Sequence, residues 1–180
     1  MTRILLVAAA LAASAGSGCA TAMNVGSHVR EGLDITQYRT YDWGPADALP
    51  TGDPRLDANP FFQDHVQGAV EKQFAARGIA RVTTGTPDVL VHYHASIDTR
   101  IDVNRTERAY LECQGAGCAG WTIEYEAGTL VLDIVDARTN SLIWRGWARE
   151  SVEGVLGHDD RMAEQIRKAV GRIFERFPAR

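Results

Sequence analysis

The chain has 180 residues and a formal net charge of −4 at pH 7. This mild acidity, without any basic stripe or run, argues against nucleic acid as a partner. Beyond the N-terminal leader, no apolar run approaches the length of a membrane-spanning helix, so we expect any membrane attachment to be made through lipid.

The N-terminal leader has the pattern of an export signal. Its apolar run, residues 4–13, has the length of a signal-peptide core rather than of a membrane span. We therefore interpret residues 1–18 as a lipoprotein signal peptide and Cys19 as the lipid attachment residue. Residues 19–32 are then predicted to be a lipid anchor and tether, and residues 33–180 a single globular domain.

Two features leave other processing of the leader open. Gly16 stands where a lipoprotein signal usually has Leu, Val or Ile, and A-x-A motifs end at Ala15 and Ala22. Cleavage at either motif would release a soluble domain. If Cys19 is lipidated, Ala20 after it favours the outer membrane over the inner one, on the periplasmic side of the envelope.

After the leader, apolar patterning predicts both strands and helices. A helix is expected from Asn59 as N-cap to Gly78, and another from Asp159 or Asp160 to Pro178. Prolines and glycines indicate a loop over residues 44–58. Segments typical of strands are residues 33–43, 79–82, 87–97, 129–135 and 141–152.

This order of elements predicts an α+β fold. We expect an antiparallel-rich sheet of about five strands with two helices packed on one face, preceded by the cleaved signal peptide.

Alternation along residues 141–152 assigns the two faces of that strand. Leu142, Trp144, Gly146 and Ala148 are expected to face the helices, and Ile143 is expected on the opposite, partly solvated face. Three further residues share that outer face and form a candidate contact surface: Arg145, Trp147 and Arg149.

The two remaining cysteines lie close together in a glycine-rich segment. Cys113 and Cys118 are predicted to form a disulfide, because an exported chain lives under oxidising conditions and the spacing is neither C-x-x-C nor repeated. The same segment contains a literal G-x-G-x-x-G at 115–120. It precedes a predicted strand instead of a helix, so we expect no dinucleotide cofactor.

His92 and His94 are the main candidates for metal chemistry. They are two residues apart on a predicted strand, so both side chains point to one face and could share a metal. A third ligand is required, and the sequence assigns none. We therefore interpret the two histidines as polar residues on the outer face of the sheet, opposite Val89, Val91 and Tyr93.

The chain resembles the DUF4136 family of bacterial lipoproteins. The resemblance rests on segments that follow in order: residues 38–43, 53–60, 87–91, 128–136, 142–147 and 173–178. It implies an exported, usually lipid-anchored domain of undefined biochemical role, and it supplies no catalytic residues to carry over.

Together these observations predict a non-enzymatic binding or structural accessory domain of the cell envelope, with an envelope protein or a cell-wall component as its partner and no cofactor. One alternative is a periplasmic metal-dependent hydrolase using His92 and His94. Another is a small-molecule binding domain, which would need an apolar pocket under the helices.

Overall fold

A computed structural model of the chain describes residues 23–45, 51, 53–103, 106–107, 112 and 122–179. Its strands are β1 (Asn24–Val29), β2 (Thr40–Trp43), β3 (Ala80–Arg81), β4 (Val89–Ile101), β5 (Glu124–Asp136) and β6 (Ser141–Ser151). Its helices are α1 (Pro54–Asp57), α2 (Phe62–Ala75) and α4 (Asp159–Phe174), with a short 3-10 turn, η1, at Ile35–Gln37. The α+β class expected from the sequence is confirmed.

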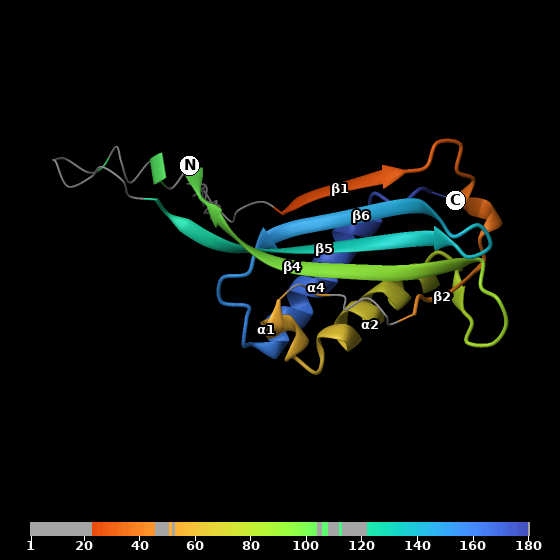
Figure 1. Cartoon of the computed structure of the whole chain (residues 1–180), viewed down its shortest axis with the longest axis horizontal. Coiled ribbons are helices and arrows are strands. Elements are labelled where there is room, and N and C mark those ends of the chain that lie inside the picture. The colour runs from red at the N-terminus through yellow and green to blue at the C-terminus, as the bar shows by residue number, and fades with distance from the viewer. Residues whose placement is uncertain are drawn as a thin grey trace, which may run out of the picture.

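The six strands form one mixed sheet in the order β1-β6-β5-β4-β2-β3 (Figure 1). Strands β4, β5 and β6 run antiparallel as consecutive neighbours, whereas β2 pairs in parallel with both β3 and β4. The prediction of about five, mainly antiparallel strands is therefore corrected: the sheet has six strands, with β1 added at one edge and parallel pairing of β2 and β3 at the other. Because β2 and β4 are connected through α2, they meet in parallel rather than as a hairpin.

One edge of the sheet comes from the segment that the sequence assigned to a tether. Residues 24–29 form β1, which pairs antiparallel with β6 from Asn24 opposite Arg149 to Val29 opposite Trp144. The tether prediction is therefore wrong for these residues. Their composition is polar and weakly patterned, but an edge strand is held mainly by backbone hydrogen bonds, which need no apolar alternation.

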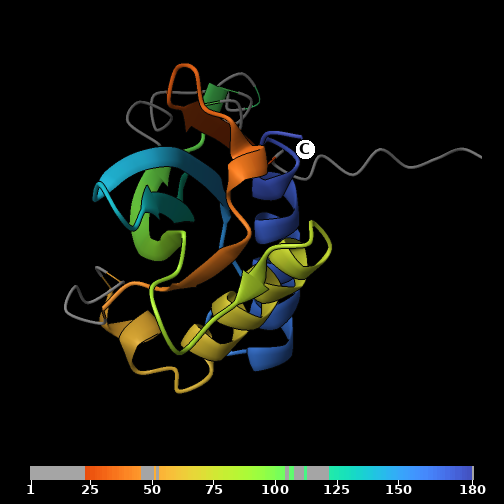
Figure 2. The same cartoon turned by 90° about the vertical axis from the view of Figure 1, so that its right-hand side faces the viewer.

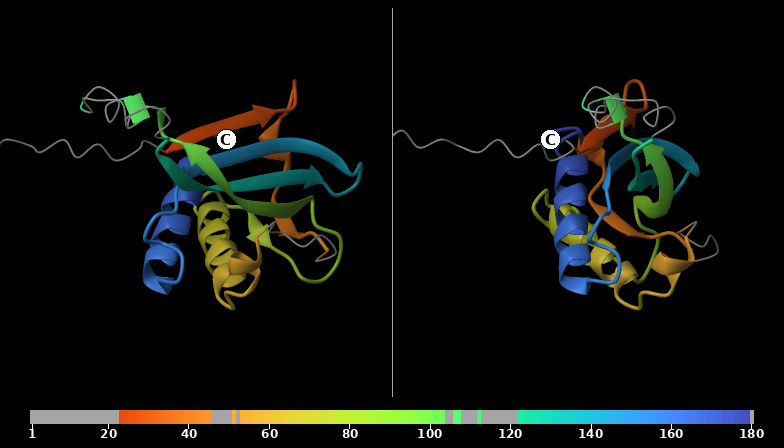
Figure 3. Two further views of the ribbon diagram at one scale, coloured as in Figure 1. Left: turned by 60° about the vertical axis from the view of Figure 1, so that its left-hand side comes forward. Right: turned by 90° about the vertical axis from the view of Figure 1, so that its left-hand side faces the viewer.

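Helices α2 and α4 pack against each other and cover the same face of the sheet, as expected. The sheet curves around them, so that its inner face and the helices enclose the core (Figures 2 and 3). Val66, Val70 and Phe74 of α2 are 0% exposed, as are Val170 and Ile173 of α4. Among the described residues, no helix is long and apolar enough to span a membrane.

A β-bulge corrects the predicted faces of β6. Val135 pairs with Leu142 but Ile134 pairs with Trp144, so Ile143 is an extra residue. The bulge turns Leu142 outward and buries Ile143, the reverse of the expected arrangement. Beyond the bulge the predicted alternation holds, and Trp144 is fully buried against the helices.

The segment before α2 also differs from its prediction. Residues 54–57, expected to be loop, form the single-turn helix α1, which Asp53 caps by accepting a hydrogen bond from the Arg55 N–H. Helix α2 begins at Phe62 rather than at Pro60. The Asn59 side chain still accepts a hydrogen bond from the Phe61 N–H at 2.8 Å, so it orders the turn that leads into the helix.

Candidate functional site

An apolar pocket lies between the inner face of the sheet and the helices. It is partly open and has a cavity volume of about 80 Å³. Small side chains create the space, because Ala95 and Ala148 flank Leu130 in one row across β4, β5 and β6. In the next row Gly128 lies between Ile97 and Glu150. These two rows form the floor of the pocket.

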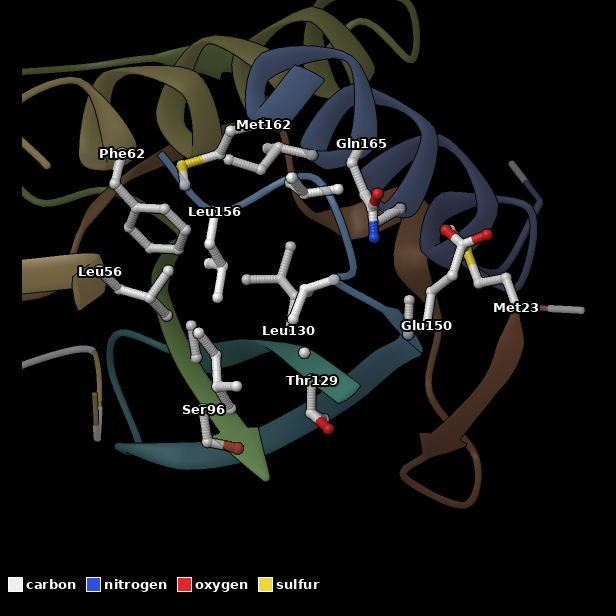
Figure 4. Close-up of a pocket in the computed structure, with 18 residues that line it drawn as sticks. Met23, Leu56, Phe62, Ser96, Thr129, Leu130, Glu150, Leu156, Met162 and Gln165 are labelled. Atoms are coloured by element: carbon white, nitrogen blue, oxygen red, sulfur yellow. The ribbon is translucent and has the colours of Figure 1, made fainter. Parts of the chain in front are cut away.

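The roof of the pocket comes from the helices and from the loop after β6. Leu56 of α1, Phe62 at the start of α2, Met162 of α4 and Leu156 of the loop lie together at one end of it (Figure 4). Leu56, Phe62 and Met162 are buried. Since all four side chains are apolar, this end offers mainly dispersion contacts, and the weakly accepting Met162 sulfur already receives a hydrogen bond from the Asn59 amide at 3.3 Å.

Helix α1 is held over the pocket by a charged clamp. The Arg55 guanidinium donates to Asp53 at 2.7 and 3.0 Å and pairs with Glu126 of β5 at 2.8 Å. The hydrogen bond from the Arg55 side chain holds the pKa of the Asp53 carboxyl below its ordinary value. The clamp thereby places Leu56 against the sheet.

Polar groups occur at the other end of the pocket. Glu150 is the charged residue among the lining residues, and its Oε1 atom pairs with Nζ of Lys168 at 2.7 Å. Its Oε2 atom is buried and has no hydrogen-bond partner among the described residues. Gln165 also faces this end, and its amide nitrogen donates to the Ser151 carbonyl at 2.8 Å.

The structure brings Arg145, Trp147 and Arg149 together on the outer face of the sheet, but engages all three with neighbours. Arg145 pairs with the buried carboxylate of Asp133 through two hydrogen bonds of 2.5 and 2.6 Å. Arg149 donates to the Thr129 hydroxyl at 3.0 Å. Trp147 is half-buried, because its ring lies over Gly26 of β1 so closely that a Cβ atom there would clash with it. Their role as a contact surface stays a prediction.

His92 and His94 also lie on the outer face, while Val89, Val91 and Tyr93 are buried on the inner one. The interpretation of the two faces of this strand is therefore confirmed. The Nε2 atom of His94 is 3.9 Å from an Asp133 oxygen that already binds Arg145. Within the described parts of the chain, no three His, Cys, Asp or Glu residues are grouped so that they could hold a metal ion.

Other predicted sites lie outside the described residues: Cys19, Cys113, Cys118 and the glycine motif at 115–120. The sequence analysis did not identify Glu150 or Met23 as pocket residues. One signal was present, since Glu150 continues the inward-facing alternation of Gly146 and Ala148, where a charge is unexpected.

Comparison with protein families gives one match. The family described as "Domain of unknown function (DUF4136)" matches residues 25–179. The match begins at the second residue of β1, in agreement with that strand being part of the domain. Comparison with curated proteins yields no match.

The chain is similar to solved structures at low sequence identity, and one of them shares its fold. A PDZ domain protein from Parabacteroides distasonis is 14% identical with a TM-score of 0.54, over 87% of this chain. The chain spans only 36% of that protein's length. Two structures of the PelC dodecamer from Paraburkholderia phytofirmans are each 8% identical with a TM-score of 0.49, and cover 88% of this chain and 99% of PelC.

Proposed function

This chain belongs to the DUF4136 family, and we propose that it is an exported, lipid-anchored envelope protein whose domain binds an apolar molecule without catalysing a reaction. The observation that carries this proposal is the pocket between the sheet and the helices. The membrane attachment would be made through Cys19, on the periplasmic side of the outer membrane.

The pocket is energetically costly when empty. At about 24 cal/mol per Å³ for an enclosed cavity, an unfilled space of about 80 Å³ in this partly open pocket lowers the free energy of unfolding by at most about 2 kcal/mol. Water would gain few hydrogen bonds at its apolar end, and an apolar cavity of about 150 Å³ is known to stay dry and bind benzene. The persistence of this apolar space in the fold supports the proposal that the pocket binds a small or slender apolar ligand.

The polar groups of the pocket support binding rather than catalysis. Its described lining residues include neither His nor Cys, and the carboxylate of Glu150 is already paired with Lys168. A nucleophile with an adjacent base, or two carboxylates across a substrate, would be needed for the common hydrolytic mechanisms. We therefore do not extend the proposal to a hydrolase.

Displacement of an apolar fluorescent probe tests the binding function. Phenylnaphthylamine is expected to brighten on binding to the mature protein and to be displaced by decanol. Ala169→Leu places a larger side chain on α4 in the pocket lining and is expected to weaken binding about tenfold. Ala163→Leu is the matched control, because Ala163 lies on the same helix outside the lining.

Equal binding by both variants would contradict a site in this pocket, and so would an absence of displaceable probe in the wild-type protein. The melting temperature of each variant shows whether it is folded at the assay temperature. These outcomes do not depend on the lipid anchor, so the two parts of the proposal are tested separately.

The anchor is tested by the intact mass of the protein extracted from membranes of its native host. A chain beginning at Cys19 with added acyl mass supports the proposal, and an unmodified chain beginning at Gly16 or Met23 contradicts it.

The same sample tests the proposed disulfide. Cys113 and Cys118 should resist alkylation until a reductant is added, whereas free thiols would contradict the pairing.

A further inference from the structure

The end of the pocket that Glu150 lines contains a carboxylate oxygen that lacks a donor among the described residues. Oε2 of Glu150 is buried and unpaired among the described residues, while Oε1 binds Lys168. The Glu150 side chain is only 16% exposed, so it has lost most of its contact with water. Buried acceptors without a partner are rare, and such an atom beside an empty pocket fits a ligand that brings the donor.

The N-terminal segment lies at the same end. Asn24 pairs with Arg149, so continuing the register places Met23 opposite Glu150, and both residues line the pocket (Figure 4). Cys19 precedes Met23 by four residues, which span at most about 14 Å when extended. A lipid on Cys19 would therefore hold this end of the pocket close to the membrane surface.

From this geometry we propose that the pocket binds a membrane-derived amphiphile with a single hydrocarbon chain and a head group that donates an N–H hydrogen bond. The hydrocarbon chain lies along the apolar residues toward Leu56 and Phe62, and the head group donates to Oε2 of Glu150. This inference rests on the proposed binding function and specifies the chemistry of its ligand.

The charge of Glu150 determines which head groups are accepted. A carboxylate prefers a cationic donor such as an ammonium group, and charge-assisted hydrogen bonds are about twice as strong as neutral ones. An anionic head group would face like-charge repulsion and leave Oε2 without a donor. Lys168 reduces this discrimination because it already neutralises part of the charge on Glu150.

Calorimetric titration of the mature protein with decylammonium and with decanoate tests the proposal. These probes share a chain length and differ in head-group charge, and both are used below the concentration at which they form micelles. Decylammonium is expected to bind about tenfold more tightly than decanoate. Glu150→Gln should abolish this preference, whereas Glu164→Gln, an exposed change on α4, should preserve it.

A second variant is expected to increase the preference for decylammonium, a result that a folding defect would not produce. Lys168→Met removes the competing donor from Oε1, so the preference for decylammonium should increase above that of the wild-type protein. An unchanged preference in both Glu150→Gln and Lys168→Met would overturn the role of Glu150, even if both probes bind. Failure of both probes to bind would instead contradict the proposed binding function.

The source of the ligand is tested by comparing the lipidated protein with Cys19→Ser. Equal binding by the two forms supports an amphiphile that comes from the membrane. If only the Cys19→Ser protein binds decylammonium, the pocket is occupied by the chain's own acyl group, and the proposed diffusible ligand is wrong.

Discussion

Gly146→Ala would force a methyl group into the core between β6 and α4. An added Cβ atom would lie 2.5 Å from Cγ2 of Ile173 and closer still to the ring of Trp144. Carbon atoms normally approach to about 3.5–4.0 Å, so at least one side chain must move by about 1 Å. Both neighbours are 0% exposed, and the Trp144 ring is packed against Phe174 and Phe177. We expect a loss of about 3 kcal/mol of stability, the upper part of the range for overpacking.

Urea unfolding followed by tryptophan fluorescence measures this loss. With a slope of about 1–3 kcal/mol per molar urea, the midpoint should fall by about 1–3 M. Gly68→Ala is the control, because Gly68 lies on α2 with nothing within 4 Å of an added Cβ atom. It should raise the free energy of unfolding by about 0.5–1 kcal/mol. A Gly146→Ala protein as stable as the wild type would refute the packing argument.

Two further predictions concern carboxylates that accept hydrogen bonds, the half-buried Asp88 and the buried Asp133. The Arg39 N–H hydrogen bond lowers the pKa of Asp88. The contribution of Asp88 to the free energy of unfolding is therefore complete above the ordinary pKa of 3.8 and is lost as pH falls through the lowered value. Melting temperatures across acidic pH should therefore fall less steeply for Asp88→Asn. Arg145→Ala leaves Asp133 buried without its guanidinium and should cost about 2 kcal/mol in urea unfolding. Recovery is expected when Asp133→Asn is added, and a loss below about 0.5 kcal/mol would contradict the importance of the pair.

The sequence predicted the parts of the fold that bury a regular apolar pattern. On α4, the stripe containing Met162, Ile166 and Val170 faces the protein core as expected. The residues predicted for the inner face of β4 are also the buried ones. The sequence did not predict β1 or the parallel pairing of β2 with β4. Both depend on backbone hydrogen bonds between distant segments, which leave no periodic signal in side chains.

The pocket was less predictable than the fold because it depends on the register in which β4, β5 and β6 pair. Ala95, Gly128 and Ala148 are unremarkable in sequence, and they create a cavity only because three strands align them beneath the helices. The bulge at Ile143 shows the same limit, since one extra residue exchanges the two faces of a strand. The faces of His92 and Trp147 were predicted correctly, but their neighbours could not be.

The central claim is that the pocket between sheet and helices is the binding site, and methyl NMR tests it most directly. On titration with decylammonium, the methyl signals of Leu56, Leu130 and Leu156 should shift together with one affinity, since all three line the pocket. Val131 is the internal reference, because it pairs with His94 and Trp147 on the outer face of the sheet. Shifts centred on Val131, or none at the three leucines, would contradict the account.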